Sequence, residues 1–188
     1  MCSEPAVRHA EVVTPSKSTS TSARRAAPSP PSTAPSPRSR WFWAAAAAGG
    51  LHAAVSLYWL LGGSLLIETV GSTMLEMFVE RRWMLAPVVL VKALAAFVPL
   101  VMDAWRPSLR RAARLACWAG VAVLVGWGGL GMIVANLVLF GVIVPEGGID
   151  RSAMIGHAWL WDPLFVVWGA CLAVGLWRTR RDAVGGRA

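Results

Sequence analysis

The residues whose side chains could bind a ligand or take part in chemistry lie within the apolar segments of this 188-residue sequence, and Lys92 is the first to consider. It is the single charged residue of the stretch 86-APVVLVKALAAFVPLVM-102. An ammonium group at the centre of a membrane span costs about 2.5–3.5 kcal/mol on insertion scales, so such a residue faces a cavity, a bundle interior or a polar partner. Lys92 is therefore a candidate binding residue.

Three environments for Lys92 remain open on sequence grounds. It can be a neutral amine, or an ammonium that meets a tryptophan ring, Trp59 or Trp168, and the amide oxygen of Asn136. The structural alternative is a side chain that snorkels outward or contacts a carbonyl freed by Pro99. Measured inward from the ends of their segments at about 1.5 Å per residue, Lys92, the two tryptophans and the asparagine all lie about 12 Å deep.

A polar and aromatic stripe follows one face of the first apolar segment, 52-HAAVSLYWLLGG-63. His52, Ser56 and Trp59 recur at the i, i+4, i+7 spacing of one helix face, and Gly63 extends it. We expect this face to point toward other helices, with the Ser56 hydroxyl bonded to the carbonyl of residue 52. His52 could move a proton or bind a headgroup, although a lone histidine without a nearby carboxylate is more often a packing residue.

The composition indicates a membrane protein. Hydrophobic residues make up 56% of the sequence and charged residues only 15%, which is too apolar for an ordinary soluble domain. The net charge of +8 comes from short basic runs between the apolar segments, not from one basic face. The lipid bilayer is the expected partner, and nucleic acid is not.

Four apolar segments are long enough to cross a hydrocarbon core of about 30 Å. Because backbone amides find no water there, each segment is predicted to be a helix. Tryptophans lie at or beside most of the segment ends, at the depth that an amphipathic indole prefers. The predicted spans are residues 41–67, 84–102, 118–144 and 159–177. The expected fold is all-α, an integral membrane antiparallel four-helix bundle of residues 41–178 with a disordered N-terminal tail.

The two tails are basic. Residues 1–40 are rich in Pro, Ser, Thr, Ala and Arg and hold almost no large apolar side chains, so they are predicted to be disordered. Forty polar residues before the first apolar segment also argue against a cleaved secretory signal. Arginines gather in this tail, between the second and third spans, and around residues 179–188, which places both termini on the cytoplasmic side of the plasma membrane. The tails are candidates for contact with anionic lipid.

Two connections carry local signals. Residues 72–83 have one acidic and one apolar helical face, which is typical of a short helix lying on a membrane surface. In 161-WDP-163, Asp162 can cap the first amides of a helix, and Pro163 fits a first-turn position. A helix starting there leaves a short span with snorkelling arginines behind it. The alternative is a helix that begins nearer His157 and bends at the proline.

Signals for catalysis are weak. The three cysteines, Cys2, Cys117 and Cys171, are scattered and form no CxxC or His/Cys cluster, so neither a disulfide framework nor a metal site is predicted. No Ser/His/Asp set, carboxylate pair or phosphate-binding loop emerges. No cofactor is expected, and an enzyme is the less favoured interpretation.

Two motifs carry a family resemblance. The segments 52-HAAVSLYWLLGG-63 and 157-HAWLWDPLFVVWG-169 resemble the bacterial family catalogued as domain of unknown function 3995, which consists of small four-span membrane proteins. The resemblance covers about residues 45–178. It implies an architecture and no mechanism. It also marks a set of residues for a shared site or shared packing: His52, Tyr58, Trp59, Gly62, Gly63, Asp162 and Pro163.

Two functions are carried forward from the sequence. The first is binding or transport of a small molecule or lipid in a polar intramembrane pocket, predicted to comprise His52, Ser56, Tyr58, Trp59, Lys92, Asn136, Asp162 and Trp168. The second is a non-catalytic accessory subunit, or a homo-oligomer, whose small-residue faces dock other membrane helices. A membrane oxidoreductase is a weaker third interpretation, since no redox pair or haem-ligand arrangement is evident.

Overall fold

The computed structural model describes residues 39–72, 74, 76, 81–102, 105 and 107–185. The predicted tail, apart from its last two residues, lies outside the described residues, and so does half of the surface helix predicted for residues 72–83. The part that is described consists of helices joined by turns and loops and contains no strand. Its elements are α1 (Ser39–Leu60), η1 (Ile67–Val70), η2 (Arg82–Met84), α3 (Leu85–Val101), α4 (Pro107–Leu139), α5 (Arg151–Gly156), η4 (His157–Trp161) and α6 (Asp162–Gly185).

Three helical stretches within these ranges are long and apolar enough to cross a membrane. They are Arg82–Val101, Leu109–Leu139 and Arg151–Thr179, the last formed by α5, η4 and α6 in succession. The 22-residue helix α1 is not among them. Alanines, glycines and polar side chains such as His52 and Ser56 stand in α1 where large apolar residues stand in the other three.

Helix α1 ends at Leu60, although the apolar segment continues to residue 67. The N–H of Gly62 donates to the carbonyl of Trp59 at 3.0 Å, and that of Gly63 donates to the carbonyl of Tyr58 at 2.9 Å. This is a Schellman cap, which needs a left-handed residue, and Gly62 supplies it with φ of 99°. The glycine pair therefore stops the helix where hydropathy alone predicts that it goes on.

The bounds of α4 also differ from the predicted span of 118–144. Its C-terminus is closed at Leu139 by the same kind of cap, with Gly141 at φ of 73°. Its N-terminus reaches back to Pro107, because backbone hydrogen bonding continues through the arginine-bearing turns that hydropathy excludes. Helix bounds follow capping chemistry, whereas the predicted bounds followed apolarity.

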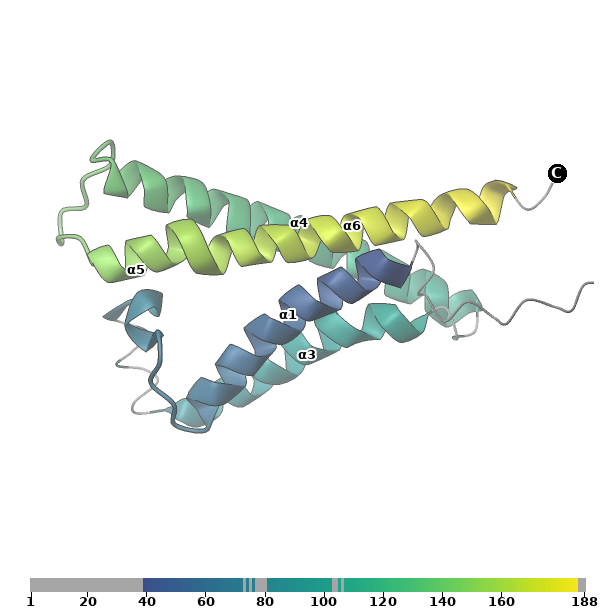
Figure 1. The fold of residues 1–188 in the computed structure, drawn as a ribbon, viewed down its shortest axis with the longest axis horizontal. Coiled ribbons are helices and arrows are strands. Elements are labelled where there is room, and N and C mark those ends of the chain that lie inside the picture. The colour runs from purple at the N-terminus through teal and green to yellow at the C-terminus, as the bar shows by residue number, and fades with distance from the viewer. Residues whose placement is uncertain are drawn as a thin grey trace, which may run out of the picture. The chain divides into compact units, whose positions relative to one another are not determined.

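The helices form two pairs that share one contact surface. Helix α1 packs against α3 and α6, α6 packs against α4 as well, and α3 and α4 make few contacts with each other (Figure 1). The core lies where α1 meets α6, around Phe42, Trp168 and Leu176. The short elements η1 and α5 also lie against each other.

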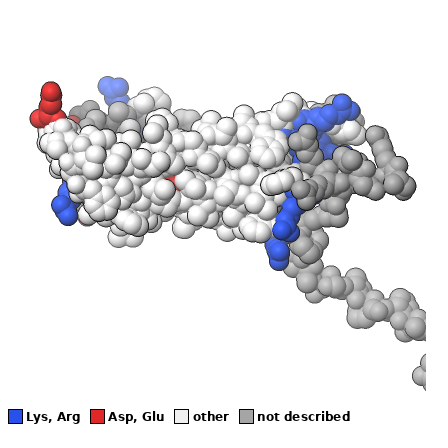
Figure 2. Space-filling model, turned by 90° about the horizontal axis from the view of Figure 1, so that it is seen from above, with Lys and Arg blue, Asp and Glu red and all other residues white. Residues whose placement is uncertain are grey.

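Charged side chains are separated along this helical unit. On the face drawn in Figure 2, Lys and Arg gather toward both ends and Asp and Glu toward one, and the broad band between them carries almost no charge. Many large apolar residues on the helices are exposed, including Leu90, Leu94, Val123 and Leu130. An exposed apolar band between charged ends is the surface expected of helices placed in a bilayer.

Candidate functional site

Lys92 of α3 is held by two side chains of α1. Its Nζ donates a hydrogen bond to Ser56 Oγ at 2.8 Å and lies 3.1 Å from Nδ1 of His52. The two α1 residues are four positions apart, so they project from the same face of the helix. That spacing allows one amine to meet both, and we refer to Lys92, Ser56 and His52 as the lysine cluster.

Ser56 ties the lysine cluster to the main chain. Its Oγ donates to the carbonyl of His52 at 3.1 Å, as expected from the sequence. Ser56 is 1% exposed and His52 is 5% exposed, so both are enclosed. The serine hydroxyl thus accepts from Lys92 and donates within α1, whereas Nε2 of His52 has no hydrogen-bond partner among the described residues.

Aromatic rings of the last helix pack over the cluster. The Phe165 ring stacks on the His52 imidazole with centroids 4.1 Å apart and planes at 30°. Lys92 Nζ lies 5.8 Å from the Phe165 centroid, within cation–π range. One turn earlier, Trp161 lies 5.8 Å from His52 and meets Trp59 edge-on at 5.3 Å. The cluster therefore has rings on the side away from α3.

A cavity of about 340 Å³ adjoins the lysine cluster, and we call it the lysine cavity. Its polar lining is the cluster together with His157, and the other lining residues are apolar or aromatic, among them Leu85 and Val88 of α3. The volume falls within the range of about 300–1,000 Å³ typical of small-molecule sites. An apolar chamber with a few convergent polar groups is also their usual composition.

A second cavity, of about 530 Å³, lies between α3, α4 and α6, and we call it the apolar cavity. It exists because α3 and α4 make few contacts. Lys92 and Phe165 line both cavities, and Lys92 is the one charged residue among the described residues that line the apolar cavity. The lysine therefore stands at the junction of a polar and an apolar space.

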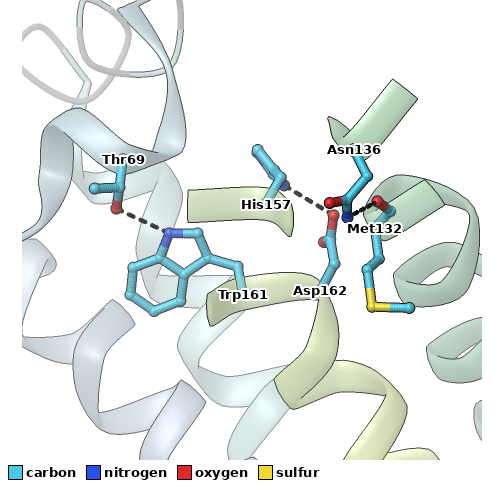
Figure 3. Close-up of polar contacts among 6 residues, drawn as sticks. All are labelled: Thr69, Met132, Asn136, His157, Trp161 and Asp162. Carbon is cyan, nitrogen blue, oxygen red and sulfur yellow. Dashed lines mark hydrogen bonds and ion pairs between the residues drawn. The ribbon is translucent and has the colours of Figure 1, made fainter. Parts of the chain in front are cut away.

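The last helix changes its winding beside the lysine cavity. It begins at α5, where Asp150 Oδ1 accepts from the N–H of Ala153 at 3.1 Å, and then forms the π-helix His157–Trp161. A π-helix bonds residues five apart, so His157 and Asp162 come to one face. His157 Nδ1 lies 3.1 Å from Asp162 Oδ2 (Figure 3).

Pro163 provides the physical reason for this winding. A proline has no N–H and its ring clashes with the carbonyl four residues earlier, here that of Trp159, and the wider π-turn relieves the conflict. The helix starts at Arg151 and passes through the proline, which is the early start that the sequence left open. Asp162 is accordingly not an N-cap but the partner of His157.

Asp162 is buried against α4. It is 1% exposed, and a Cβ placed on Gly131 would overlap its Oδ2, so the carboxylate lies directly on the glycine. Asn136 of α4 stands beside it in Figure 3, but the Asn136 amide donates to the carbonyl of Met132 in its own helix, at 2.8 Å. The side chain of His157 is 34% exposed and lines the lysine cavity, whereas Asp162 does not.

The segment between α1 and η2 is hydrogen-bonded to residues beside the lysine cavity and to Asp150. Trp59 Nε1 donates to the carbonyl of Leu65 at 2.9 Å, and Trp161 Nε1 donates to Thr69 Oγ1 at 3.0 Å (Figure 3). The N–H of Ser72 donates to Asp150 Oδ2 at 3.0 Å. Residues 61–72 are thus bonded to Trp59 and Trp161, two of the three aromatic residues that line the lysine cavity.

The structure distributes the eight residues predicted for the pocket over several places. Four line the lysine cavity: His52, Ser56, Trp59 and Lys92. Trp168 lines the apolar cavity, with its Nε1 buried and without a partner in the described part of the chain. Tyr58 is 45% exposed and points away from α1's buried face. Asn136 and Asp162 are not among the residues that line either cavity.

One of the environments left open for Lys92 placed it against Trp59 or Trp168 and Asn136, and the structure gives it other partners. The cation–π contact falls on Phe165 and not on Trp59 or Trp168, and the polar partners are His52 and Ser56 in place of Asn136. Equal depth fixes the height of a residue in a membrane but not the direction in which its helix turns it.

Three site residues were missed by sequence reasoning: Trp161, Phe165 and His157. Trp161, Phe165 and Trp168 repeat in the last span the i, i+4, i+7 spacing of the stripe on α1, and this signal was available. The His157–Asp162 pair has a spacing of five, which no regular α-helix brings together. Only Pro163 marked the place where the winding changes.

Comparisons with known proteins give one result. The family described as "Protein of unknown function (DUF3995)" matches residues 48–172, which include both the lysine cluster and the His157–Asp162 pair. None of the curated proteins matches the chain, and none of the solved structures does.

Proposed function

This chain belongs to the DUF3995 family of proteins of unknown function, and we propose that it is a four-span membrane protein that binds a small molecule or lipid beside Lys92. The observation that carries the proposal is a half-buried lysine, bonded to Ser56 and His52, on the wall of a cavity of about 340 Å³. Transport of the bound molecule is a further form of the same proposal.

The four-span architecture combines three strongly apolar stretches with α1. At about 1.5 Å per residue, the 22 residues of α1 reach about 33 Å, enough for a hydrocarbon core of about 30 Å. Its contacts with α3 and α6, both part of apolar stretches, favour the same depth. Consecutive spans then run in opposite directions, which gives an antiparallel bundle.

Charge favours one orientation. Arg110, Arg111 and Arg114 lie in the first turns of α4, and Arg178 lies near the end of α6, whereas the connections at the other ends carry acidic residues such as Glu68, Glu146 and Asp150. The positive-inside rule then places both termini in the cytoplasm of a cell whose plasma membrane holds the protein.

Reporter fusions test this topology. Fluorescent-protein fusions at residue 188 and before residue 1 are expected to fluoresce, and alkaline phosphatase fusions after residue 70 and after residue 148 are expected to be active. Two termini on opposite sides would mean three spans, with α1 outside the membrane, and would contradict the proposed architecture.

Stability alone gives no reason for a lysine at position 92. Its two polar partners, the Ser56 hydroxyl and the His52 imidazole, carry no negative charge, and within the described residues no carboxylate pairs with it. A methionine of similar length would fill the space without the cost of burying a charge. A ligand that uses the ammonium provides the reason that packing does not.

Native mass spectrometry of the protein released from its own membrane tests ligand binding. We expect a retained small molecule or lipid in the wild-type protein, none after Lys92→Ala, and unchanged retention after Asn136→Leu. The control removes an intramembrane polar group that lines neither cavity. Equal retention by all three proteins would contradict the proposal.

One observation favours the accessory-subunit interpretation as a second candidate. Ala122 and Gly126 of α4 are exposed, are four residues apart, and nothing lies within 4 Å of a Cβ placed on Gly126. Paired small residues on an open face allow another membrane helix to approach closely. A companion chain seen by native mass spectrometry, and lost after Gly126→Leu, would support it, and a lone monomer would count against it.

A further inference from the structure

We infer that the ligand of the lysine cavity is a single-chain organic acid, whose carboxylate binds Lys92 while its hydrocarbon chain occupies the apolar cavity. The inference rests on the proposed function and specifies its ligand class. Three features of the described residues lead to it: the balance of donors and acceptors at Lys92, the single charge, and the junction of the two cavities.

The lysine cluster has more donors than acceptors. An ammonium carries three N–H groups and accepts nothing. Two of these groups are used by Ser56 Oγ and His52 Nδ1, and the third has no hydrogen-bond acceptor within the described residues. Lys92 Nζ also lies 5.8 Å from the centroid of the Phe165 ring. The cluster therefore lacks one acceptor for its cation.

The contact with Lys92 also bears on the tautomer of His52. When Lys92 is an ammonium, which can only donate, Nδ1 of His52 is the accepting nitrogen and Nε2 carries the proton. Nε2 belongs to a side chain that is 5% exposed, and it has no hydrogen-bond partner among the described residues. A buried donor without a partner is an uncommon feature.

The single positive charge of the lysine cluster indicates the charge of the ligand. The lysine cluster carries a single positive charge and no carboxylate pairs with it in the described part of the chain, so a monoanion neutralises the site. One oxygen of a carboxylate can accept the free N–H of Lys92. A charge-assisted bond of this kind is among the strong polar contacts in proteins.

The apolar cavity accounts for the rest of the molecule. It begins at Lys92 and continues along Val91, Leu94 and Val98 of α3, opposite Leu124 of α4 and Leu172 of α6. A hydrocarbon chain attached to an acid at Lys92 would lie directly against these side chains. The junction of a cationic end and an apolar chamber matches one acidic headgroup with one chain.

Binding of three C18 amphiphiles to the purified full-length protein tests the inference. Stearate, octadecanol and octadecylamine share a chain and differ in the headgroup, and native mass spectrometry in a nonionic detergent counts each bound molecule. We expect one stearate per chain, with octadecanol weaker by on the order of 10-fold or more and octadecylamine not retained.

Two variants and a control assign the binding to Lys92. Lys92→Met is expected to weaken stearate by on the order of 10-fold while leaving octadecanol unchanged, and Lys92→Arg is expected to keep most of the preference for stearate. Asn136→Leu is expected to behave as the wild type. Thermal unfolding of each variant reports whether it is folded, and Lys92→Arg keeps the test informative if Lys92→Met is not.

The outcomes separate this inference from the proposed function. Equal binding of stearate and octadecanol, with no effect of Lys92→Met, would overturn the acid ligand but leave a binding pocket in place. Failure to retain any of the three amphiphiles would also overturn it, and the molecules that copurify with the wild-type protein would then decide the proposed function by themselves. Preferential binding of octadecylamine would reverse the assigned charge.

Discussion

The molecule holds two oppositely charged side chains in its apolar region, the half-buried Lys92 and the buried Asp162, and treats them differently. The polar partners of Lys92 come from another helix, since they are Ser56 and His52 of α1. The polar partner of Asp162 comes from its own helical stretch, where the π-helix brings His157 to it. The Asp162 carboxylate also packs directly on Gly131 of α4. Each charge has a histidine beside it, but only Lys92 lines a cavity.

This difference separates a binding role from a structural role. The carboxylate of Asp162 is packed against a helix backbone, which leaves no room for a ligand. Lys92 keeps a free donor and adjoins two chambers. A charged group that is enclosed by protein partners stabilises a helix contact. A charged group that keeps an unused hydrogen-bond donor beside a cavity is suited to bind a ligand.

The contact at Gly131 gives the largest expected effect. Gly131→Leu would push a side chain into the Asp162 carboxylate and separate α4 from α6, so the free energy of unfolding should fall by about 3 kcal/mol. Gly126→Leu is the matched control, because nothing lies within 4 Å of a Cβ at that position. Thermal unfolding in detergent measures both, and equal losses would contradict the packing described for Asp162.

The His157–Asp162 pair should show coupling in a double-mutant cycle. Asp162→Leu removes the acceptor of His157 and is expected to cost about 2 kcal/mol of unfolding free energy. His157→Phe combined with it should cost less than the sum of the single changes, with an interaction free energy of about 1 kcal/mol. Additive effects would mean that the two side chains do not stabilise each other.

Lys92→Met should act in the opposite direction on stability. It removes the cost of burying a charge, while Ser56 keeps its bond to the carbonyl of His52. We expect the unfolding free energy to stay the same or to rise by up to about 1 kcal/mol, even though ligand binding is lost. A loss as large as that of Asp162→Leu would mean that Lys92 is structural as well.

The smallest effect concerns pH and lies outside both sites. The pKa of the Asp150 carboxyl is lowered because the N–H groups of Ala153 and Ser72 donate to it. A group with a lowered folded-state pKa stabilises above its ordinary value of about 3.9 and loses that contribution as the pH falls through the folded-state pKa. Unfolding temperatures should therefore drop slightly below about pH 4 in the wild type and less in Asp150→Asn, which can still cap α5. An equal drop in both would exclude Asp150 as the source.

Much of the fold was readable because it depends on local properties of the chain. The apolar segments predict helices, since a backbone in lipid has no other partners, and three of them are long and apolar enough to cross a membrane. The helix ends were misplaced where Gly62 and Gly141 form caps, because hydropathy does not measure backbone conformation. The α1 stripe was recognised as a buried face, and His52, Ser56 and Trp59 are all buried.

The sequence by itself determined which face of α1 is buried and that Lys92 needs a partner, because helical spacing and the cost of placing a charge in an apolar segment act within one segment. Only the tertiary structure decided which partner it has. His52 and Ser56 reach Lys92 because α1 packs against α3, and Phe165 reaches it because α6 packs against α1. The rotation of each helix about its axis is set by such packing between distant segments, and depth along a span carries no information about it.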